Sequence, residues 1–405
     1  MSSHSNDHMK MKDVLYISYD GMLEPLGQSQ VLSYIEKLAT NRRIYLLSFE
    51  KAEDWRDVAR RSEISRRITA AGVQWYPRRF HGGPFWSAKI YDLIVGVVTA
   101  SWIVLRHGTR IVHARSYVPG LMALIVRPAG TRFLFDMRGF WVDERVDGEN
   151  WSRGGRAHRM GKRLEKRLLL AADHIVSLTE AAVRELEQFS YLRNRALPIT
   201  VIPTCVDIAR FQLKANVEGT FVFGYVGTAG TRYVFDAFVR CFLRLSSLRP
   251  GARLLILNRG EHDQIWEALR RGGVPDDVVE LRATEHAEVP EQMARMHASA
   301  FFSKPVFSKL ASAPTRLGEF LACGVPCLAN GGVGDVADIL RRERVGAVVD
   351  GFDDDAIERG LRELLALVDE PGIAERCSDV AKRRFSLQHG VARYAEIYHQ
   401  LDDSA

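Results

Sequence analysis

The chain has 405 residues, a length that exceeds one ordinary hydrophobic core and suits two domains. Hydrophobic residues make up 46% and charged residues 26%, which are ordinary values for a globular protein. A formal net charge of +6 at pH 7 suits an anionic nucleotide, an anionic membrane surface or solubility alone. No nucleic-acid-binding motif accompanies the charge, so nucleic acid is not an expected partner.

Residues 1–12 (MSSHSNDHMKMK) contain no apolar core, so we expect a disordered tail rather than a signal peptide. The five cysteines lack the spacing of metal ligands, and we expect reduced, mostly buried thiols in a cytoplasmic protein. These are Cys205, Cys241, Cys323, Cys327 and Cys377.

Residues 13–203 are predicted to form an α/β domain, because strands and helices alternate as in a mostly parallel sheet covered on both faces. The strand Val14–Ser18 leads through a loop with glycines to a helix at Gln28–Ala39. This loop lacks G-x-G-x-x-G, so a dinucleotide is not expected there. Further strands are predicted at Ile44–Phe49, Val73–Pro77, Ile111–Ala114, Phe133–Asp136 and His174–Leu178.

Ligands of such sheets lie beyond the carboxyl ends of the strands. This rule selects Gly27, Gln28, Arg115, Ser116, Tyr117, Asp136, Arg138 and Thr179. Arg138 either binds a phosphate of a donor or acceptor or forms salt bridges with neighbouring acids. Asp136, Asp143 and Glu144 are alternative bases for an acceptor hydroxyl.

Two segments of the first domain bear on a membrane. Ile90–Leu105 is strongly apolar, but it contains Asp92 and is shorter than the roughly 20 residues of a membrane span, so we expect a buried or interfacial helix. Arg153–Arg167 carries seven basic residues and one acid, Glu165. It is either a solvated helix face or a contact with anionic lipid, which would place the protein at the inner face of the cytoplasmic membrane.

Residues 204–385 are predicted to form a second α/β domain, and residues 386–405 a C-terminal helix. The strand Phe221–Val226 is followed by GTAGTR (Gly227–Arg232), where small residues let backbone N–H groups approach an anion and Arg232 adds a charge. Later strands are predicted at Leu254–Leu257, Val278–Leu281, Ser299–Ser303, Cys327–Ala329 and Gly346–Val349, and helices at Glu288–His297, Asp335–Arg342, Asp354–Val368, Ile373–Arg384 and Leu387–Leu401.

The stretch Ser303–Asn330 reads as a polar loop, a short helix at Thr315–Cys323 and a strand. Pro314 suits the first turn of the helix, and Gly324 suits its end. Arg316 and Glu319 lie three residues apart on one side of this helix.

This stretch is either an ordinary connection or a holder for a nucleotide diphosphate. In the second case the helix N-terminus, Lys304 and Lys309 bind phosphates, and Glu319 accepts hydrogen bonds from ribose hydroxyls.

The segment GEFLACGVP resembles the donor-site helix of retaining glycosyltransferases of family four (glycosyl transferases group 1), in particular enzymes of bacterial surface polysaccharides. DGMLEPLGQSQV and FDMRGFWVDERVDG resemble one branch of the same family. The resemblance implies the GT-B fold, in which two Rossmann-like domains face each other across a cleft and a C-terminal helix crosses back to the first domain.

The resemblance also implies roles for individual residues. The catalytic candidates are Arg232, Lys309, Arg138 and Asp136. The donor-binding candidates are Gly27, Gly227, Thr228, Gly230, Arg232, Asn258, Lys304, Lys309, Pro314, Thr315, Arg316 and Glu319. The acceptor-side candidates are Gln28, Arg115, Ser116, Tyr117 and Arg138.

Two departures from the family pattern affect the expected chemistry. The family usually has a second acid eight residues before Glu319, where this chain has Ala311, or Lys309 if the loop is longer. Many relatives have a histidine near the position of Arg138, and none is present here. These departures leave the contacts to the donor sugar open, but not the nucleotide end.

The resulting hypothesis is a retaining, metal-independent hexosyltransferase without a cofactor, acting in polysaccharide, glycolipid or lipopolysaccharide biosynthesis. Its donor is a nucleotide sugar, linked to UDP or GDP, and its acceptor is a glycan or a lipid-linked glycan. The acids of Asp353–Asp355 favour a helix N-terminus and are not taken as metal ligands. The alternatives are a nucleotide-sugar epimerase or hydrolase of the same fold, and a non-catalytic nucleotide-sugar-binding subunit.

Overall fold

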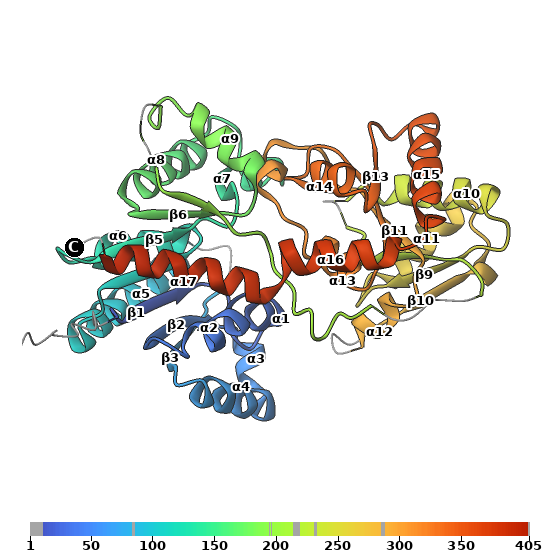
Figure 1. Ribbon diagram of the computed structural model, residues 1–405. Helices are drawn as coiled ribbons and strands as arrows, with labels where there is room; N and C mark the ends of the chain where they lie inside the picture. Colours follow the sequence, from blue (N-terminus) through green and yellow to red (C-terminus); the bar gives the residue numbers. More distant parts are fainter. Residues whose placement is uncertain are drawn as a thin grey trace, which may run out of the picture.

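A computed structural model describes residues 11–82, 86–193, 195, 197–213, 219–230, 233–284 and 288–403. The chain forms two α/β domains that lie side by side, each built on a parallel sheet, and the last helix runs back from the second domain across the first (Figure 1). The predicted fold of two Rossmann-like domains is confirmed.

The first domain contains a seven-stranded sheet in the order β3-β2-β1-β4-β5-β6-β7. Neighbouring strands all pair in parallel. All residues of the central strands β1 and β4 are buried, as expected for a sheet covered on both faces. The strands are β1 (Val14–Ser18), β2 (Ile44–Glu50), β3 (Gln74–Arg79), β4 (Ile111–Arg115), β5 (Arg132–Asp136), β6 (His174–Ser177) and β7 (Ile199–Val201).

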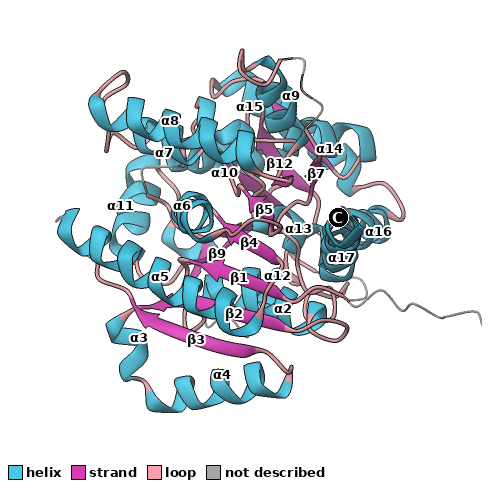
Figure 2. Ribbon diagram, turned by 90° about the vertical axis from the view of Figure 1, so that its left-hand side faces the viewer, coloured by secondary structure: helices cyan, strands magenta, loops and turns pink. Residues whose placement is uncertain are grey.

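Helices cover the two faces of this sheet with separate cores. Leu15 and Ile17 of β1 pack into a core with α5, α6 and α8, whereas Val14 and Tyr16 pack into a core with α2, α4 and the C-terminal helix α17. Figure 2 shows α5 and α6 on one side of the sheet and α2 and α17 on the other. The helices after β2 are α3 (Ala52–Arg56), α4 (Val58–Ala70), α5 (Trp86–His107), α6 (Tyr117–Val126), α7 (Trp141–Asp147), α8 (Arg156–Ala171) and α9 (Glu180–Gln188).

The helix predicted at Gln28–Ala39 differs from the observed one. It begins earlier, with α1 (Pro25–Gly27), continues as a π-helical turn over Gln28–Leu32 and ends as α2 (Ser33–Leu38). Pro25 supports the earlier start because its ring fits the first helical position. A Cβ atom on Gly27 would lie 1.9 Å from the carbonyl oxygen of Gly21, so glycine lets this helix start press against the loop before it.

The second domain contains a six-stranded sheet in the order β10-β9-β8-β11-β12-β13. Its cores place α13, α14 and α16 on one face and α10, α11 and α15 on the other. The strands are β8 (Val222–Val226), β9 (Arg253–Leu257), β10 (Val279–Arg282), β11 (Ala298–Phe301), β12 (Cys327–Asn330) and β13 (Gly346–Val349). The helices are α10 (Phe235–Leu248), α11 (His262–Gly272), α12 (Val289–Met293), α13 (Thr315–Ala322), α14 (Val336–Glu343), α15 (Asp354–Val368) and α16 (Ile373–Phe385), with short 3₁₀ turns at Asp276–Val278 and Phe307–Ala311.

The chain passes between the domains twice, at neighbouring places. After β7 it enters the second domain, and after α16 it returns as α17 (Leu387–Asp403). The two crossings pair where Val206 donates to the Phe385 carbonyl at 2.7 Å and Leu387 donates to the Val206 carbonyl at 2.9 Å. The predicted return of the last helix to the first domain is confirmed.

Three side chains of α17, spaced four residues apart, bind polar groups of the first domain. The Tyr394 hydroxyl donates to Asp136 at 3.1 Å, the Tyr398 hydroxyl lies 2.7 Å from His113 Nδ1, and Asp402 forms a buried ion pair with Arg42 at 2.6 Å. Residues four apart share one face of a helix, so this row fixes both the register and the rotation of α17.

The apolar segment predicted at Ile90–Leu105 forms most of α5. By length and composition this helix could cross a membrane, and 33% of its apolar window is buried. Ala100, Ile103 and Val104 pack into the core of the first domain, while the opposite side is exposed. We therefore describe α5 as a surface helix of the first domain. All five cysteines are buried and free, as predicted.

Candidate active site

The carboxyl end of β8 opens into a loop that begins with Gly227, Thr228, Ala229 and Gly230. Gly227 has a φ of 116°, and a Cβ atom there would lie 2.5 Å from the guanidinium of Arg316. Glycine is therefore required for the conformation and for the close approach. Thr231 and Arg232 lie outside the described residues, so the roles predicted for Arg232 stay predictions.

Asn258, at the end of β9, fixes this loop from the side. Its amide donates to the Gly227 carbonyl at 3.0 Å and to Glu261 at 2.9 Å, and its oxygen accepts from the backbone N–H of Glu261. The Glu261 carboxylate in turn accepts from the Ala229 N–H at 2.7 Å. A carboxylate thus already occupies one of the loop amides that the sequence assigned to an anion. Asn258 reaches the predicted donor site, where it shapes the loop.

Arg316 extends from the first turn of α13 over the same loop. Its guanidinium lies 4.5 Å from the ring centre of Tyr233 and 5.9 Å from those of Tyr225 and Phe301, at cation–π distance. Among the described residues, its NH1 atom is buried and has no hydrogen-bond partner. A guanidinium with one buried and unused donor beside a glycine loop is suited to bind an anion.

Helix α13 begins at Thr315, as the sequence predicts, and ends at Ala322, one residue before the predicted end. Pro314 immediately precedes Thr315, the first residue of the helix. Gly324 has a φ of 79°, and the N–H groups of Gly324 and Val325 donate to the carbonyls of Leu321 and Phe320. Because Arg316 in the first turn reaches Gly227, the N-terminal end of α13 lies beside the Gly227 loop.

Glu319 lies one turn after Thr315 and faces a different part of the site. Both residues line a cavity of about 340 Å³ that Gln28, Ser29 and Gln30 of the first domain also line, so this cavity lies between the domains. Burial raises the pKa of Glu319 to about 7, although Arg316 and Arg210 act in the opposite direction. The Gln28 amide donates to the Leu23 carbonyl at 3.3 Å, a bond within the first domain. Because Gln28 and Glu319 line the same cavity, the two domains bring them together.

The loop before α13 makes a strap from the second domain to the first. Phe307 stacks on Phe140 with ring centres 5.2 Å apart, and the Ser308 N–H donates to Asp147 at 2.9 Å. The Leu310 carbonyl accepts from the Thr179 hydroxyl at 2.6 Å, and Ala311 packs into the core of the first domain. The family's second acid was expected at Ala311 or Lys309, and a charged side chain at Ala311 would be buried in this core.

The two lysines of this loop differ in position. Lys304 is exposed, and Lys309 is partly buried within the strap. The Lys309 carbonyl accepts from the Gly334 N–H at 2.8 Å, which ties the strap to the glycine turn after β12. Lys309 therefore lies near the boundary between the domains. Its predicted role, the binding of a donor phosphate, stays a prediction.

Arg115, Ser116 and Arg138 lie at the carboxyl ends of β4 and β5, on the edge of the first sheet. Ser116 has a φ of 72° and Arg138 a φ of 61°, conformations that cost energy for residues other than glycine. Arg115 donates to Asp20 at 3.2 Å. Such strain often marks functional positions, which favours keeping Ser116 and Arg138 on the acceptor side.

Two candidates occupy places that do not fit the predicted roles. Tyr117 is fully buried, and its hydroxyl donates to Glu165 at 2.8 Å inside the first domain, so we remove it from the acceptor side. Asp136 is also buried, and it accepts from the Tyr394 hydroxyl of α17. Burial alone would raise its pKa, but Arg138, His113 and Arg115 lower it below the ordinary value. A catalytic base needs a pKa near neutral, so we assign Asp136 a structural role.

Glu261, Tyr233 and Tyr394 belong to the site or its support but were not predicted from the sequence. Glu261 follows the turn after β9, and only its spacing of three residues from Asn258 could have indicated in the sequence that it supports the loop. The other two act through contacts with residues far away in the sequence. Within the part of the chain described, no group of three histidine, cysteine or acidic side chains is arranged to hold a metal.

Comparisons with known proteins show the class to which the two domains belong. Residues 44–205 match the family model of the glycosyl transferase 4-like domain, and residues 207–384 match that of glycosyl transferases group 1. Together the two models cover most of the chain, so the chain is a glycosyltransferase of the GT-B fold, and its second domain is of the group 1 type. No curated protein matches the sequence.

Solved structures of similar fold include three glycosyltransferase-related proteins. Sucrose-phosphate synthase from Thermosynechococcus elongatus is 14% identical with a TM-score of 0.72, covering 97% of this chain and 100% of its own. HepE from Anabaena, in complex with UDP and glucose, is 14% identical with a TM-score of 0.66 and coverages of 95% and 99%. WaaG, a glycosyltransferase involved in lipopolysaccharide biosynthesis, is 14% identical with a TM-score of 0.62 and the same coverages. At this identity the likeness establishes the fold.

Proposed function

We propose that this glycosyltransferase moves a sugar from a nucleotide diphosphate to a glycan or lipid-linked acceptor, with retention of the anomeric configuration. The observation that carries the proposal is the buried NH1 atom of Arg316, which has no hydrogen-bond partner among the described residues, in a guanidinium that lies against the Gly227 loop. One turn further along the same helix, Glu319 faces the cavity between the domains. A structural neighbour, HepE, binds UDP-glucose, which supports a nucleotide sugar as donor.

The proposed catalysis rests on charge stabilisation and positioning. Negative charge grows on the departing diphosphate, and a preformed cationic donor stabilises that charge more than it stabilises the bound substrate. Arg316 supplies this donor within an aromatic surrounding that holds its plane. Lys304, Lys309 and Arg232 are proposed to add the remaining positive charge, so that the reaction needs no metal. Closure of the two domains would exclude water.

Thermal stabilisation against a panel of UDP- and GDP-linked sugars tests this function. A ligand at about 100 times its Kd should add roughly 2.7 kcal/mol to the stability. The stabilising donor is then incubated with glycan and lipid-linked acceptors, and transfer is followed by mass spectrometry. Turnover of the donor without any acceptor would instead indicate an epimerase or hydrolase, and binding without turnover would indicate a non-catalytic subunit.

Donor binding is predicted to depend on pH through Glu319. A carboxyl group with a pKa of about 7 is largely neutral at pH 6 and ionised at pH 8. Only the ionised form accepts hydrogen bonds from both ribose hydroxyls, so affinity for a nucleotide sugar should rise about tenfold over this interval. Calorimetry at pH 6, 7 and 8 checks this, because the diphosphate of a nucleotide sugar loses no proton in that range.

The Glu319→Gln variant is the control for this pH dependence. Its affinity should be about constant between pH 6 and 8 and weaker than that of the wild type at pH 8, by about 1–3 kcal/mol. The same raised pKa means that the folded state binds a proton more tightly than the unfolded state. Wild-type stability without ligand should therefore fall as pH rises from about 4.5 to about 7. Identical pH profiles for both proteins would exclude this role of Glu319.

We also propose that the first domain rests on an anionic membrane. Helices α5, α6 and α8 cover the same face of its sheet. The exposed side of α5 is apolar, and α8 presents exposed basic residues while its acid, Glu165, is buried. The exposed apolar side chains on this face are Ile90, Tyr91, Ile94, Val98, Trp102, Leu105, Ile125 and Met160. The exposed basic ones are Arg153, Arg156, Arg159, Arg163, Lys166 and Arg167.

Removal of two basic residues from α8 should weaken binding to anionic vesicles. Each arginine near such a surface contributes about 1 kcal/mol, so the Arg159→Gln, Arg163→Gln variant should bind about thirtyfold more weakly. Sedimentation with phosphatidylglycerol vesicles at several salt concentrations measures this. The matched control replaces the exposed Arg359 and Arg362 of α15 in the second domain. Equal losses in both variants, or binding that ignores salt, would assign these arginines to a solvated surface.

A further inference from the structure

A second cavity, of about 460 Å³, opens beside the carboxyl ends of β2 and β3 in the first domain. Glu50 ends β2 and Arg79 ends β3, and α3 follows β2 directly. Ligands of parallel sheets bind beyond this edge, which also carries Arg115 and Arg138. The cavity is separate from the one that contains Glu319, because the two share no lining residue.

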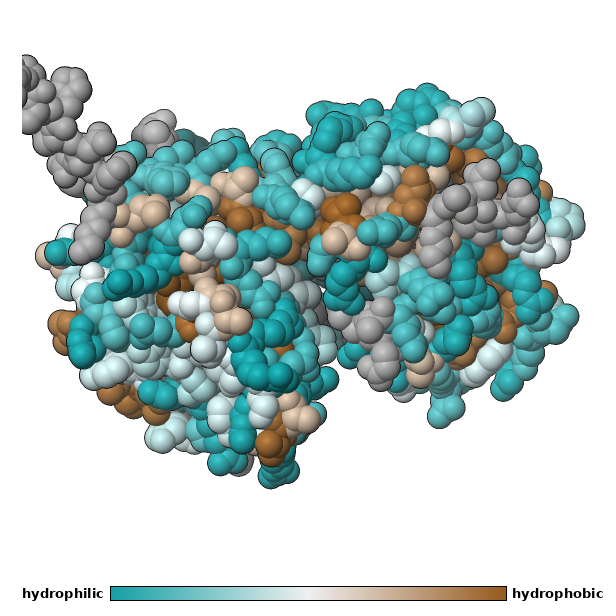
Figure 3. All heavy atoms as spheres, turned by 60° about the horizontal axis from the view of Figure 1, so that its bottom comes forward, coloured by the Kyte–Doolittle hydropathy of each residue, from teal (hydrophilic) through white to brown (hydrophobic). Residues whose placement is uncertain are grey.

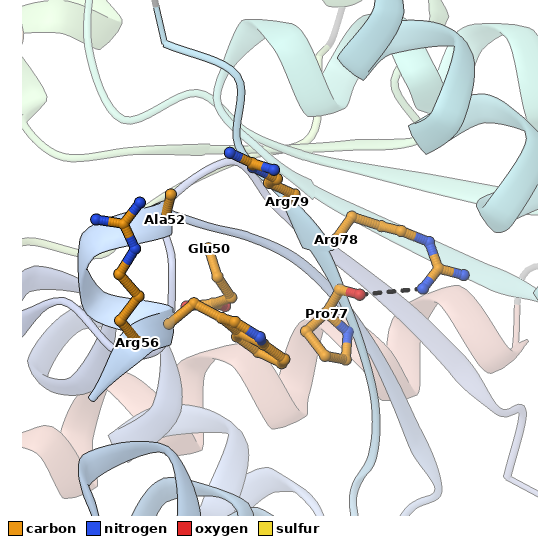
Figure 4. A pocket seen from close by; sticks show the side chains of 7 residues that line it. Glu50, Ala52, Arg56, Pro77, Arg78 and Arg79 are labelled. Atoms are coloured by element: carbon orange, nitrogen blue, oxygen red, sulfur yellow. Dashed lines mark hydrogen bonds between the residues drawn. The ribbon is translucent and has the colours of Figure 1, made fainter. Parts of the chain in front are cut away.

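Three arginines and an aromatic ring line this cavity (Figure 4). Arg78 is held in place, since it donates to the Thr99 hydroxyl of α5 at 2.9 Å and to the Pro77 carbonyl at 3.0 Å. Arg56 and Arg79 are exposed, and no acidic side chain among the described residues forms an ion pair with either. Figure 4 shows the guanidinium groups of Arg56 and Arg79 on the same side of the cavity, reached from α3 and from β3.

The one acid in the lining does not neutralise these arginines. Glu50 is buried, and its carboxylate accepts hydrogen bonds from the backbone N–H groups of Met22 and Leu23 and from the Ser48 hydroxyl. These bonds hold the carboxylate against the first loop of the domain. The cavity therefore keeps an excess of positive charge, with two guanidinium groups that have unused donors.

We propose that this cavity binds a phosphate group of the acceptor. The inference rests on the proposed transferase function, because it assigns the acceptor of that reaction to a chemical class. A phosphate group has enough charge and oxygen atoms to engage two guanidinium groups together, which a hydroxyl-bearing neutral glycan does not. The phosphate comes either from a phosphorylated sugar or from a lipid diphosphate.

The surroundings of the cavity suit an acceptor larger than an ion. Trp55 lines it and offers a ring surface, and its volume exceeds that of a single phosphate. Thr99 of α5 contacts Arg78, and Trp102 of α5 lies 5.8 Å from Tyr76 of β3. Helix α5 therefore packs against β3 beside the cavity, although none of its residues lines the cavity.

Direct binding to simple probes tests the inference. Calorimetry compares glucose 1-phosphate and geranyl diphosphate in detergent with the neutral methyl glucoside and with glucuronate. The Arg56→Gln, Arg79→Gln variant should bind the phosphate probes about tenfold or more weakly than the wild type. The matched control, Arg43→Gln with Arg66→Gln, removes the same charge from exposed positions outside the cavity and should bind like the wild type.

The assay needs neither a donor nor turnover, so its result is independent of the transferase proposal. Phosphate bound at the donor site is unaffected by the cavity variant, which separates the two sites. Loss with glucose 1-phosphate supports a phosphorylated sugar, and loss with geranyl diphosphate alone supports a lipid diphosphate. Equal affinities in the cavity and control variants, no binding of either phosphate probe, or equally tight binding of glucuronate would overturn the inference.

Discussion

The Arg316→Gln variant is expected to reduce kcat/KM for sugar transfer by about 10²–10³-fold. The guanidinium of Arg316 lies near the rings of Tyr233, Tyr225 and Phe301, and its NH1 atom is buried without a hydrogen-bond partner in the part of the chain that the structure describes. A fixed donor of this kind stabilises leaving-group charge without reorganisation. Most of the loss should appear in kcat, because the diphosphate charge is larger in the transition state than in the bound substrate.

Arg259→Gln provides the control, since Arg259 is an exposed arginine directly after Asn258. Its kinetics should stay close to those of the wild type. Arg316→Lys should recover only part of the rate, because an ammonium group neither stacks as a plane nor presents two donors side by side. Thermal unfolding of all three variants shows whether the fold is intact. A folded Arg316→Gln enzyme with unchanged kcat and a raised KM would show that this residue contributes ground-state binding alone.

The arrangement of the two domains could be predicted because it depends on local patterns. Buried strands of parallel sheets are apolar and short, and the helices between them show helical spacing, so most predicted strands lie within two residues of the observed ones. The ends of α13 follow from Pro314 and Gly324, whose backbone preferences act at their own positions. The helix predicted at Glu288–His297 is shorter in the structure, where α12 spans Val289–Met293. The last predicted residues form the turn that leads into β11.

The roles of individual side chains were harder to predict because their partners are distant in the sequence. Asp136 was taken as a catalytic candidate from its place after a strand, yet its partner Tyr394 lies 258 positions away. Tyr117 follows β4 in the same way, but the first turn of α6 directs its side chain into the core, toward Glu165. Position after a strand selects the correct edge of the sheet, and only tertiary packing decides which side chains face the ligand.

The two domains are connected along one side only on the face drawn in Figure 3. There the two lobes are joined along one side and separated by a notch on the other. The connections are the strap of residues 307–311, the linker after β7 and the helix α17. Since the strap and the Glu319 cavity lie between the domains, the geometry of the site depends on how α17 holds the first domain.

Replacement of Asp402 by alanine is therefore expected to destabilise the first domain by about 3–5 kcal/mol. Asp402 and Arg42 form an ion pair in which both side chains are only 4% exposed, and Asp402 also accepts from the backbone N–H of Lys12 at 3.2 Å. Loss of the carboxylate leaves the Arg42 charge buried without its partner, which costs more than the pair contributes when intact. Urea unfolding followed by tryptophan fluorescence measures the change.

The neighbouring Asp403 is the matched control, because it is exposed on the same last turn of α17. Asp403→Ala should change stability by no more than about 0.5 kcal/mol. The double variant Arg42→Met, Asp402→Leu removes both charges and should recover much of the loss, since apolar residues of similar size avoid the unpaired charge. If Asp402→Ala and Asp403→Ala unfold at the same urea concentration, the pair does not anchor α17. If Asp402→Ala is destabilised and the double variant is not, the loss in Asp402→Ala comes from the unpaired charge of Arg42, and the ion pair itself adds little stability. The contacts of Tyr394 and Tyr398 are then sufficient to fix the helix.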